Sequence, residues 1–278
     1  MIALLASMLR IFWPYALAAT GGLFSERAGV INLALEGFLL WGAFLCATFA
    51  LASGSATVGI IAALVGGVLH GLTYLWLAER FRSQQVLLGI AFNLTAAAST
   101  RFALKLLYGS ASNSPHIEAS APMGVIAAIA LAIAALVLGK SVLGTRICAA
   151  GDNPAALRAL KLSVLRPRMA ALAATGMLTA LGGAALTLGQ HQYTDNMSAG
   201  RGYIAVAAVI FGSWRLRPAL LACLLFAAAE AGQFWAQGRV PVPPQLLQAL
   251  PYLICLAALS LRRGNARAPA ALSSASND

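Results

Sequence analysis

The chain has 278 residues, of which 60% are hydrophobic and 10% charged, and its mean hydropathy is +0.81. Soluble domains carry about 25% charged residues, so this composition excludes a water-soluble globular protein. The net charge of +11 comes from Lys and Arg that stand singly or in small groups between apolar runs, which excludes a continuous basic surface for nucleic acid.

Apolar runs bounded by charged or turn residues follow one another along the chain. A spanning helix needs about 20 mainly apolar residues. The sequence therefore predicts an all-α polytopic membrane protein with about nine transmembrane segments, in the range eight to ten, over residues 1–263. The run 203–213 is too short to cross as a helix, so we expect a short or broken helix there. The runs are 2–24, 29–51, 57–78, 84–107, 122–139, 168–189, 203–213, 217–236 and 245–261.

Positive charge falls unevenly on the connecting segments of this arrangement. Fourteen Lys and Arg belong to one side, and only Arg201 and Arg239 belong to the other. Because cytoplasmic loops are enriched in Lys and Arg, we expect the N-terminus outside and the C-terminus in the cytoplasm. Residues 140–168 are then the longest cytoplasmic loop. The tail 264–278 has few large apolar residues and is expected to be disordered.

Two glycine pairs indicate an inverted repeat. Gly21-Gly22 ends one apolar run, and after a polar break Gly29-Val30-Ile31 opens the next. Gly182-Gly183 is likewise followed by a polar break and by Gly202-Tyr203-Ile204. The two pairs would lie on helices of opposite direction, as in transporters whose substrate route runs between inverted repeats.

The cytoplasmic loop contains a signal for a short helix over about 154–162. Asp152 or Asn153 can cap a helix that begins at Pro154, because the first turn leaves amide hydrogens unpaired and proline lacks one. The segment is either a surface linker with snorkelling arginines or a coupling helix that seats in a soluble partner.

Polar residues inside the apolar runs are candidates for a substrate pathway, because burying them in a bilayer is costly. Glu36 follows Asn32 by four residues, so on a helix both would face the same way. With Asn93 they could offer hydrogen bonds to a passing substrate. The alternative is structural: Glu36 would pair with Arg101 or Lys105, and the asparagines would tie helices together.

Four segments resemble the permease subunits of ATP-binding cassette (ABC) importers. They are residues 22–37 (GLFSERAGVINLALEG), 151–156 (GDNPAA), 195–205 (DNMSAGRGYIA) and 210–214 (IFGSW). The wider group handles branched-chain amino acids, ribose and other simple sugars, and the sequence most closely resembles its nucleoside and simple-sugar permeases. The similarity runs over nearly the whole chain in the same order.

The resemblance implies a homologous second permease subunit, two ABC ATPase subunits or one fused ATPase, and an extracytoplasmic solute-binding (lipo)protein. It also implies that the segment after Gly151 is the coupling helix, with candidate coupling residues Gly151, Asp152, Asn153, Pro154, Arg158 and Lys161. Relatives have a glycine and an isoleucine where this chain has Lys161-Leu162. The helix could therefore run on or meet its ATPase differently.

ATP hydrolysis is not expected in this chain. Gly139-Lys140-Ser141 resembles the end of a phosphate-binding loop, but Ala134 stands where that motif requires its first glycine. We therefore expect no bound cofactor, no enzymatic activity and no catalytic residues, with ATP used by a partner subunit. The cysteines share no spacing typical of metal ligands, so no metal site is expected; they are Cys46, Cys148, Cys223 and Cys255.

A polar segment precedes Arg201 on the outer side. It is either a solvated loop or a docking site for the binding protein, and the candidate docking residues are Gln190, Tyr193, Asp195 and Asn196.

The function predicted from these features is import of a nucleoside or simple sugar across a bacterial cytoplasmic membrane. The alternatives are a branched-chain amino acid permease of the same kind and an ion-coupled secondary carrier that titrates Glu36 or Glu230. An intramembrane enzyme ranks far behind, since no Ser and His stand at a plausible spacing within the runs.

Overall fold

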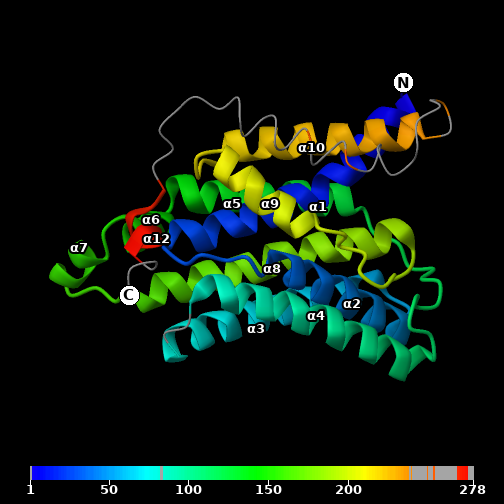
Figure 1. The fold of residues 1–278 in the computed structure, drawn as a ribbon, viewed down its shortest axis with the longest axis horizontal. Coiled ribbons are helices and arrows are strands. Elements are labelled where there is room, and N and C mark those ends of the chain that lie inside the picture. The colour runs from blue at the N-terminus through cyan, green and yellow to red at the C-terminus, as the bar shows by residue number, and fades with distance from the viewer. Residues whose placement is uncertain are drawn as a thin grey trace.

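A computed structural model describes residues 2–81, 84–237 and 268–274, with the single residues 239, 249 and 253. These residues form a bundle of helices without strands, and one isolated bridge joins Asn113 to Thr194 in two loops (Figure 1). The predicted span 245–261 lies almost wholly outside the described residues. The helices are α1 (Ile2–Arg27), α2 (Leu35–Ser53), α3 (Ala56–Phe81), α4 (Gln85–Tyr108), α5 (Met123–Lys140), α6 (Val142–Asp152), α7 (Pro154–Ala159), α8 (Leu165–Gln190), α9 (Arg201–Phe211), α10 (Leu216–Ala236) and α12 (Ala270–Ser274).

By length and composition, six of the described helices can cross a membrane: α2, α3, α4, α5, α8 and α10. The 26 residues of α1 give it comparable length. α9 has 11 residues and so rises only about 16 Å, roughly half of a bilayer's hydrocarbon core. The all-α polytopic architecture and the short helix near 203–213 are thus confirmed.

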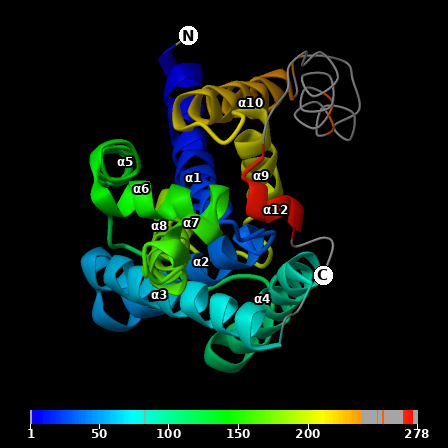
Figure 2. The same cartoon turned by 90° about the vertical axis from the view of Figure 1, so that its left-hand side faces the viewer.

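Much of the outer surface of the bundle is apolar. Only 22% of the α4 span and 17% of the α5 span is buried, and Leu94, Phe102 and Ile133 are all more than half exposed. An apolar surface of this extent suits lipid or another membrane subunit. Seen end-on in Figure 2, α5 and α4 lie at separate edges of the bundle, while α7 lies over its middle.

α8 is the centre of the bundle and packs against α1, α2 and α3. The backbones of α3 and α8 touch: a Cβ on Gly176 would lie 1.9 Å from the carbonyl oxygen of Gly67, and one on Gly67 would lie 2.3 Å from that of Gly176. Small residues permit such close approach between membrane helices. Only glycine fits at these two positions.

The helices α1–α2–α3 and α8–α9–α10 are arranged as a repeat. α3 packs on α8 as α10 packs on α1, and α2 packs on α8 as α9 packs on α1. α1 and α8 are antiparallel, since Arg168 at the start of α8 donates to Ala28 beyond the end of α1, while Thr175 further along donates to Gly21. This pattern supports the predicted inverted repeat.

The register of that repeat differs from the one that the glycine motifs indicated. Gly202 is the second residue of α9, and its structural counterpart is Glu36, the second residue of α2. Gly29 lies earlier, in a non-helical stretch, with a φ of +78°. Apolar sequence continues through this stretch, so hydropathy alone did not reveal it.

One end of the bundle carries α6, α7 and α12, and the N-terminus lies at the other end (Figure 1). The ends of α1, α3 and α5 with Arg27, Arg80 and Lys140 lie on the α7 side, as does the start of α10. Assignment of this end to the cytoplasm stays a prediction. The expectation of a disordered tail does not hold for residues 268–274, where α12 packs against α6 and Ala271 is buried.

Candidate functional site

The segment between α1 and α2 is not helical. Residues 28–34 form a turn and an extended stretch, and α2 begins only at Leu35. The prediction of one helix over 29–51 was therefore wrong for its first residues, and Asn32 and Glu36 do not share a helix face. Asn32 is fully buried and its Oδ1 accepts a hydrogen bond from the Ala34 amide at 2.9 Å, which shapes the entry into α2.

Glu36 joins the N-termini of two helices. Its Oε1 accepts from the Gly200 amide and its Oε2 from the Gly202 amide, each at 2.7 Å. The first turn of a helix has unpaired N–H groups and a partial positive charge, so a buried carboxylate is stabilised there. Glu36 does not pair with Arg101 or Lys105; the Arg101 side chain lies 3.6 Å from Asp195 instead.

Asn93 on α4 contacts the same junction. Its Oδ1 accepts from the Gly37 amide at 2.8 Å, and its Nδ2 donates to the Leu33 carbonyl at 2.8 Å and to the Tyr203 hydroxyl at 2.9 Å. Asn93 thereby ties α4 to both helix starts, as the structural alternative anticipated. Tyr203 is 47% exposed, in contrast to the buried Asn93 and Glu36.

A second cluster of polar side chains lies at the junction, and the sequence did not predict that its members contact one another. Arg201, the first residue of α9, forms an ion pair with Glu230 on α10, and the Tyr15 hydroxyl of α1 donates to the other carboxylate oxygen at 2.7 Å. The sequence did contain a signal for this pair: Glu230 is a carboxylate inside an apolar run, and such a group needs a partner in a membrane. The first turn of α9 is thus held by α2, α4 and α10, and Tyr15 of α1 fixes the Glu230 carboxylate that pairs with Arg201.

At the other end of the bundle, the predicted loop 140–168 is mostly helical. α6 occupies Val142–Asp152, and α7 begins at Pro154 with Asn153 as its cap, because the Asn153 Oδ1 accepts from the Ala156 amide at 3.0 Å. Gly151 lies against α1: a Cβ there would be 2.2 Å from the carbonyl oxygen of Arg27. α7 is therefore connected to the end of α1 through a close backbone contact.

α7 ends earlier than predicted, at Ala159 rather than 162. Lys161 has a φ of +56°, the left-handed conformation that glycine adopts more readily, and the Leu162 amide donates back to Leu157 at 2.9 Å. The helix does not run on, so lysine performs the terminating role of the glycine it replaces. Arg158 and Lys161 are exposed, and Leu160 is 70% exposed.

The loop 191–200, at the end of the bundle opposite α7, is tied to the loop 109–121. The Ser114 amide donates to the Tyr193 carbonyl, and the Tyr193 amide donates to the Ser114 Oγ, both at 2.9 Å. Tyr193 is buried against Phe44, and burial raises the pKa of its phenol to about 12. Of the candidate docking residues, Gln190 and Asn196 are the exposed ones.

Comparison with known proteins gives a family and several relatives. The family model described as "Branched-chain amino acid transport system / permease component" matches residues 4–259. The guanosine ABC transporter permease protein NupQ of Bacillus subtilis is 32% identical over 93% of this chain and 91% of its own length. The nucleoside ABC transporter permease protein NupC of Lactococcus lactis is 31% identical over 96% and 94%. The putative glucose ABC transporter permease protein TsgC13 of Haloferax volcanii is 28% identical over 88% and 86%.

No solved structure matches this chain. The family match covers nearly all of the chain, including the α2–α9 junction and the α6–α7 segment. The chain is therefore a multi-pass membrane protein that belongs to the branched-chain amino acid transport system permease family.

Proposed function

We propose that this chain is the membrane-spanning subunit of an ATP-driven importer that carries nucleosides across a bacterial cytoplasmic membrane. The observation that carries the proposal is full-length similarity to two relatives, NupQ and NupC, whose names state guanosine and nucleosides. The putative glucose permease is less similar, which makes simple sugars the second candidate. A nucleoside includes a ribose, so both candidates share hydroxyl chemistry.

The partners proposed follow from the exposed surfaces. An ABC ATPase would dock on α7 and the turn that follows it, where Arg158, Leu160 and Lys161 are exposed. A homologous permease subunit would cover part of the apolar outer surface. A solute-binding protein would approach the opposite end, near Gln190 and Asn196. ATP would be hydrolysed by the ATPase subunits alone.

The contacts described above suggest how an ATPase could act on the substrate route. A displacement of α7 would move α6, because Asn153 connects them directly. Gly151 would pass that movement to the end of α1, and the stretch 28–34 would pass it to Glu36. Glu36 holds the first turn of α9, so the position of α9 would depend on the state of the ATPase.

The proposal is tested by transport in proteoliposomes. The chain is co-expressed with the permease, ATPase and binding protein of its own source, and uptake of radiolabelled guanosine, ribose and leucine is measured. We expect guanosine uptake that requires internal ATP and continues after ionophores remove the ion gradients. Uptake of leucine but not guanosine would overturn the nucleoside assignment, and uptake that needs an ion gradient but no ATP would identify a secondary carrier.

A further inference from the structure

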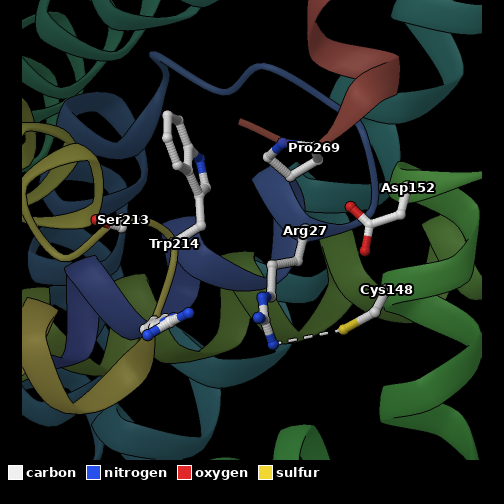
Figure 3. Close-up of a pocket in the computed structure, with 7 residues that line it drawn as sticks. Arg27, Cys148, Asp152, Ser213, Trp214 and Pro269 are labelled. Carbon is white, nitrogen blue, oxygen red and sulfur yellow. Dashed lines mark hydrogen bonds between the residues drawn. The ribbon is translucent and has the colours of Figure 1, made fainter. Parts of the chain in front are cut away.

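A cavity of about 430 Å³ lies at the α7 end of the bundle, beside the contact between α6 and α1 (Figure 3). Its volume lies within the range of small-molecule sites in proteins. Four separate parts of the chain form its walls: the end of α1, α6, the turn before α10 and the segment before α12. The lining residues are Arg27, Cys148, Asp152, Ser213, Trp214, Arg215 and Pro269.

The charges in this lining are unbalanced. Among the described residues, the Arg27 guanidinium donates to the Cys148 Sγ alone, from Nη1 at 3.5 Å, and thiols are weak acceptors. Within the described part of the chain, neither Arg27 nor Arg215 has a carboxylate within 4 Å; the ion pairs there use Arg101, Arg168 and Arg201. Two guanidinium groups therefore share a cavity with a single carboxylate, that of Asp152.

The wall opposite α6 is held in a defined conformation. Ser213 and Trp214 are consecutive non-glycine residues with φ values of +52° and +55°. Such conformations cost about 1 to 2 kcal/mol per residue and persist where surrounding contacts enforce them. Here the Trp214 indole N–H donates to the buried Glu26 carboxylate, and this hydrogen bond fixes the indole. Glu26 precedes Arg27 in the chain, but its carboxylate bonds Trp214 and forms no ion pair with Arg27.

We propose that this cavity binds the phosphate group of a small anion between Arg27 and Arg215. Guanidinium groups bind phosphate through paired charge-assisted hydrogen bonds. Among the described residues no carboxylate forms an ion pair with Arg27 or Arg215, so both guanidinium groups can bind an added anion. Asp152 supplies an acceptor for a hydroxyl group on the same ligand. Two ligands carry a phosphate beside hydroxyls at this position: a nucleoside monophosphate from solution and the phosphatidylglycerol head group of the bilayer.

Binding at this cavity would bear on transport. The ligand would bridge α1, α6 and the turn before α10, which are the elements next to α7. Bridging them would favour one arrangement of α6 against α1, so the anion would act on ATPase coupling. If the ligand is a nucleoside monophosphate, the activity of the importer would then depend on the concentration of nucleoside that has been phosphorylated after uptake. This last step rests on the proposed function, but phosphate binding does not.

The test is a binding measurement on the full chain, purified with its partner subunits in nanodiscs. Guanosine 5′-monophosphate is titrated calorimetrically in nanodiscs of phosphatidylcholine alone. Guanosine, which lacks the phosphate, is titrated in the same way, and the comparison is how each ligand responds to the cavity variants. In parallel, native mass spectrometry measures phosphatidylglycerol retained from mixed-lipid nanodiscs. The variants are Arg27→Gln and Arg215→Gln, and the control is Arg217→Gln, an exposed arginine outside the cavity.

We expect the affinity for the monophosphate to be lowered at least about tenfold in each cavity variant and unchanged in the control. Binding of guanosine, which the importer also carries as substrate, is expected to be the same in all of these proteins. Retention of phosphatidylglycerol that is lost in both cavity variants, without monophosphate binding, assigns the phosphate to lipid. Asp152→Asn removes a charge of the same sign as phosphate, so inorganic phosphate titrated in the same nanodiscs is expected to bind this variant more tightly than the wild type. Arg27→Lys preserves the charge and is expected to restore part of the affinity lost in Arg27→Gln.

The proposal is overturned if neither ligand binds, or if Arg217→Gln lowers binding as much as the cavity variants. None of these readouts needs transport, so they stand even if the substrate is not a nucleoside.

Discussion

Glu36 and Gly202, 166 residues apart in the chain, meet where the helices α2 and α9 begin: the Gly202 amide donates to the Glu36 Oε2 at 2.7 Å. They occupy equivalent positions in the two repeats, each being the second residue of its helix. A Cβ on Gly202 would lie 2.3 Å from the Glu36 nitrogen, so one repeat supplies the carboxylate and the other the space for it.

Replacing Glu36 by alanine should destabilise this junction by about 2 to 4 kcal/mol, because two buried amides lose a charged acceptor. Glu36→Gln keeps one acceptor oxygen and should have a smaller effect. Thermal unfolding of the purified complex measures both, with Glu118→Gln, at an exposed residue of the loop 109–121, as the control. Equal unfolding temperatures for the wild type and Glu36→Ala would contradict the proposed role of the carboxylate.

The α3–α8 contact should not tolerate any side chain. Gly176→Ala places a Cβ 1.9 Å from the Gly67 carbonyl oxygen, so the helices must separate along their length. We expect loss of monodisperse protein in size-exclusion chromatography. Gly139→Ala is the matched control, since no atom lies within 4 Å of its Cβ and alanine favours a helix by about 1 kcal/mol. If both variants behave alike, the close backbone contact is not needed.

Charge reversal at the end of α7 and in the turn after it should separate ATP hydrolysis from transport. Arg158→Glu with Lys161→Glu leaves the membrane helices untouched, so the subunit should still insert and assemble, while substrate uptake falls at least about tenfold through the loss of two ionic contacts of about 1 kcal/mol each. Uptake and ATPase activity are measured in the same proteoliposomes. The double reversal Lys140→Glu with Arg166→Glu, at the same end but outside α7, serves as the control. Unchanged uptake in the α7 variant would remove the basis for naming α7 a coupling helix.

Lys161→Gly should stabilise the end of α7 by about 1 kcal/mol, because glycine adopts a positive φ without the clash of a Cβ. Lys161→Asn tests the loss of charge separately, since asparagine tolerates this conformation. Resistance of α7 to limited proteolysis should increase for glycine, change little for asparagine and decrease for the β-branched Lys161→Val. A valine variant as resistant as the wild type would show that the backbone conformation is unimportant.

Local chemistry made some of these features predictable from the sequence. The start of α7 depends on neighbouring residues alone, with Asn153 as the cap and Pro154 as the first helical residue. The run 203–213 is too short to span a bilayer, which its length in the sequence shows directly. The end of α7 was missed because the terminating position holds lysine instead of glycine. Residues 28–34 were missed because a stretch containing Val30, Ile31 and Leu33 is as apolar as a helix.

The candidate site was less predictable, since its contacts join distant parts of the chain. Glu36 was recognised as a costly intramembrane carboxylate, but its partners are backbone amides, which have no signature in the sequence. Asn93 has the same difficulty with two of its three contacts. Arg201 and Glu230 were each visible as charges, yet only the packing of α9 on α10 pairs them.

The charged side chains at the α2–α9 junction all have partners, and this affects which solutes the junction can bind. Glu36 is held by two amides, and Arg201 is neutralised by Glu230, so the described residues at this depth offer a cation or proton no unpaired charge to bind. An ion would have to break one of these contacts before it could bind here, whereas the half-exposed Tyr203 offers an uncharged solute a hydroxyl and a ring face. This pairing of charge suits the neutral nucleoside that we propose as substrate, and a route along this junction would not conduct ions across the membrane.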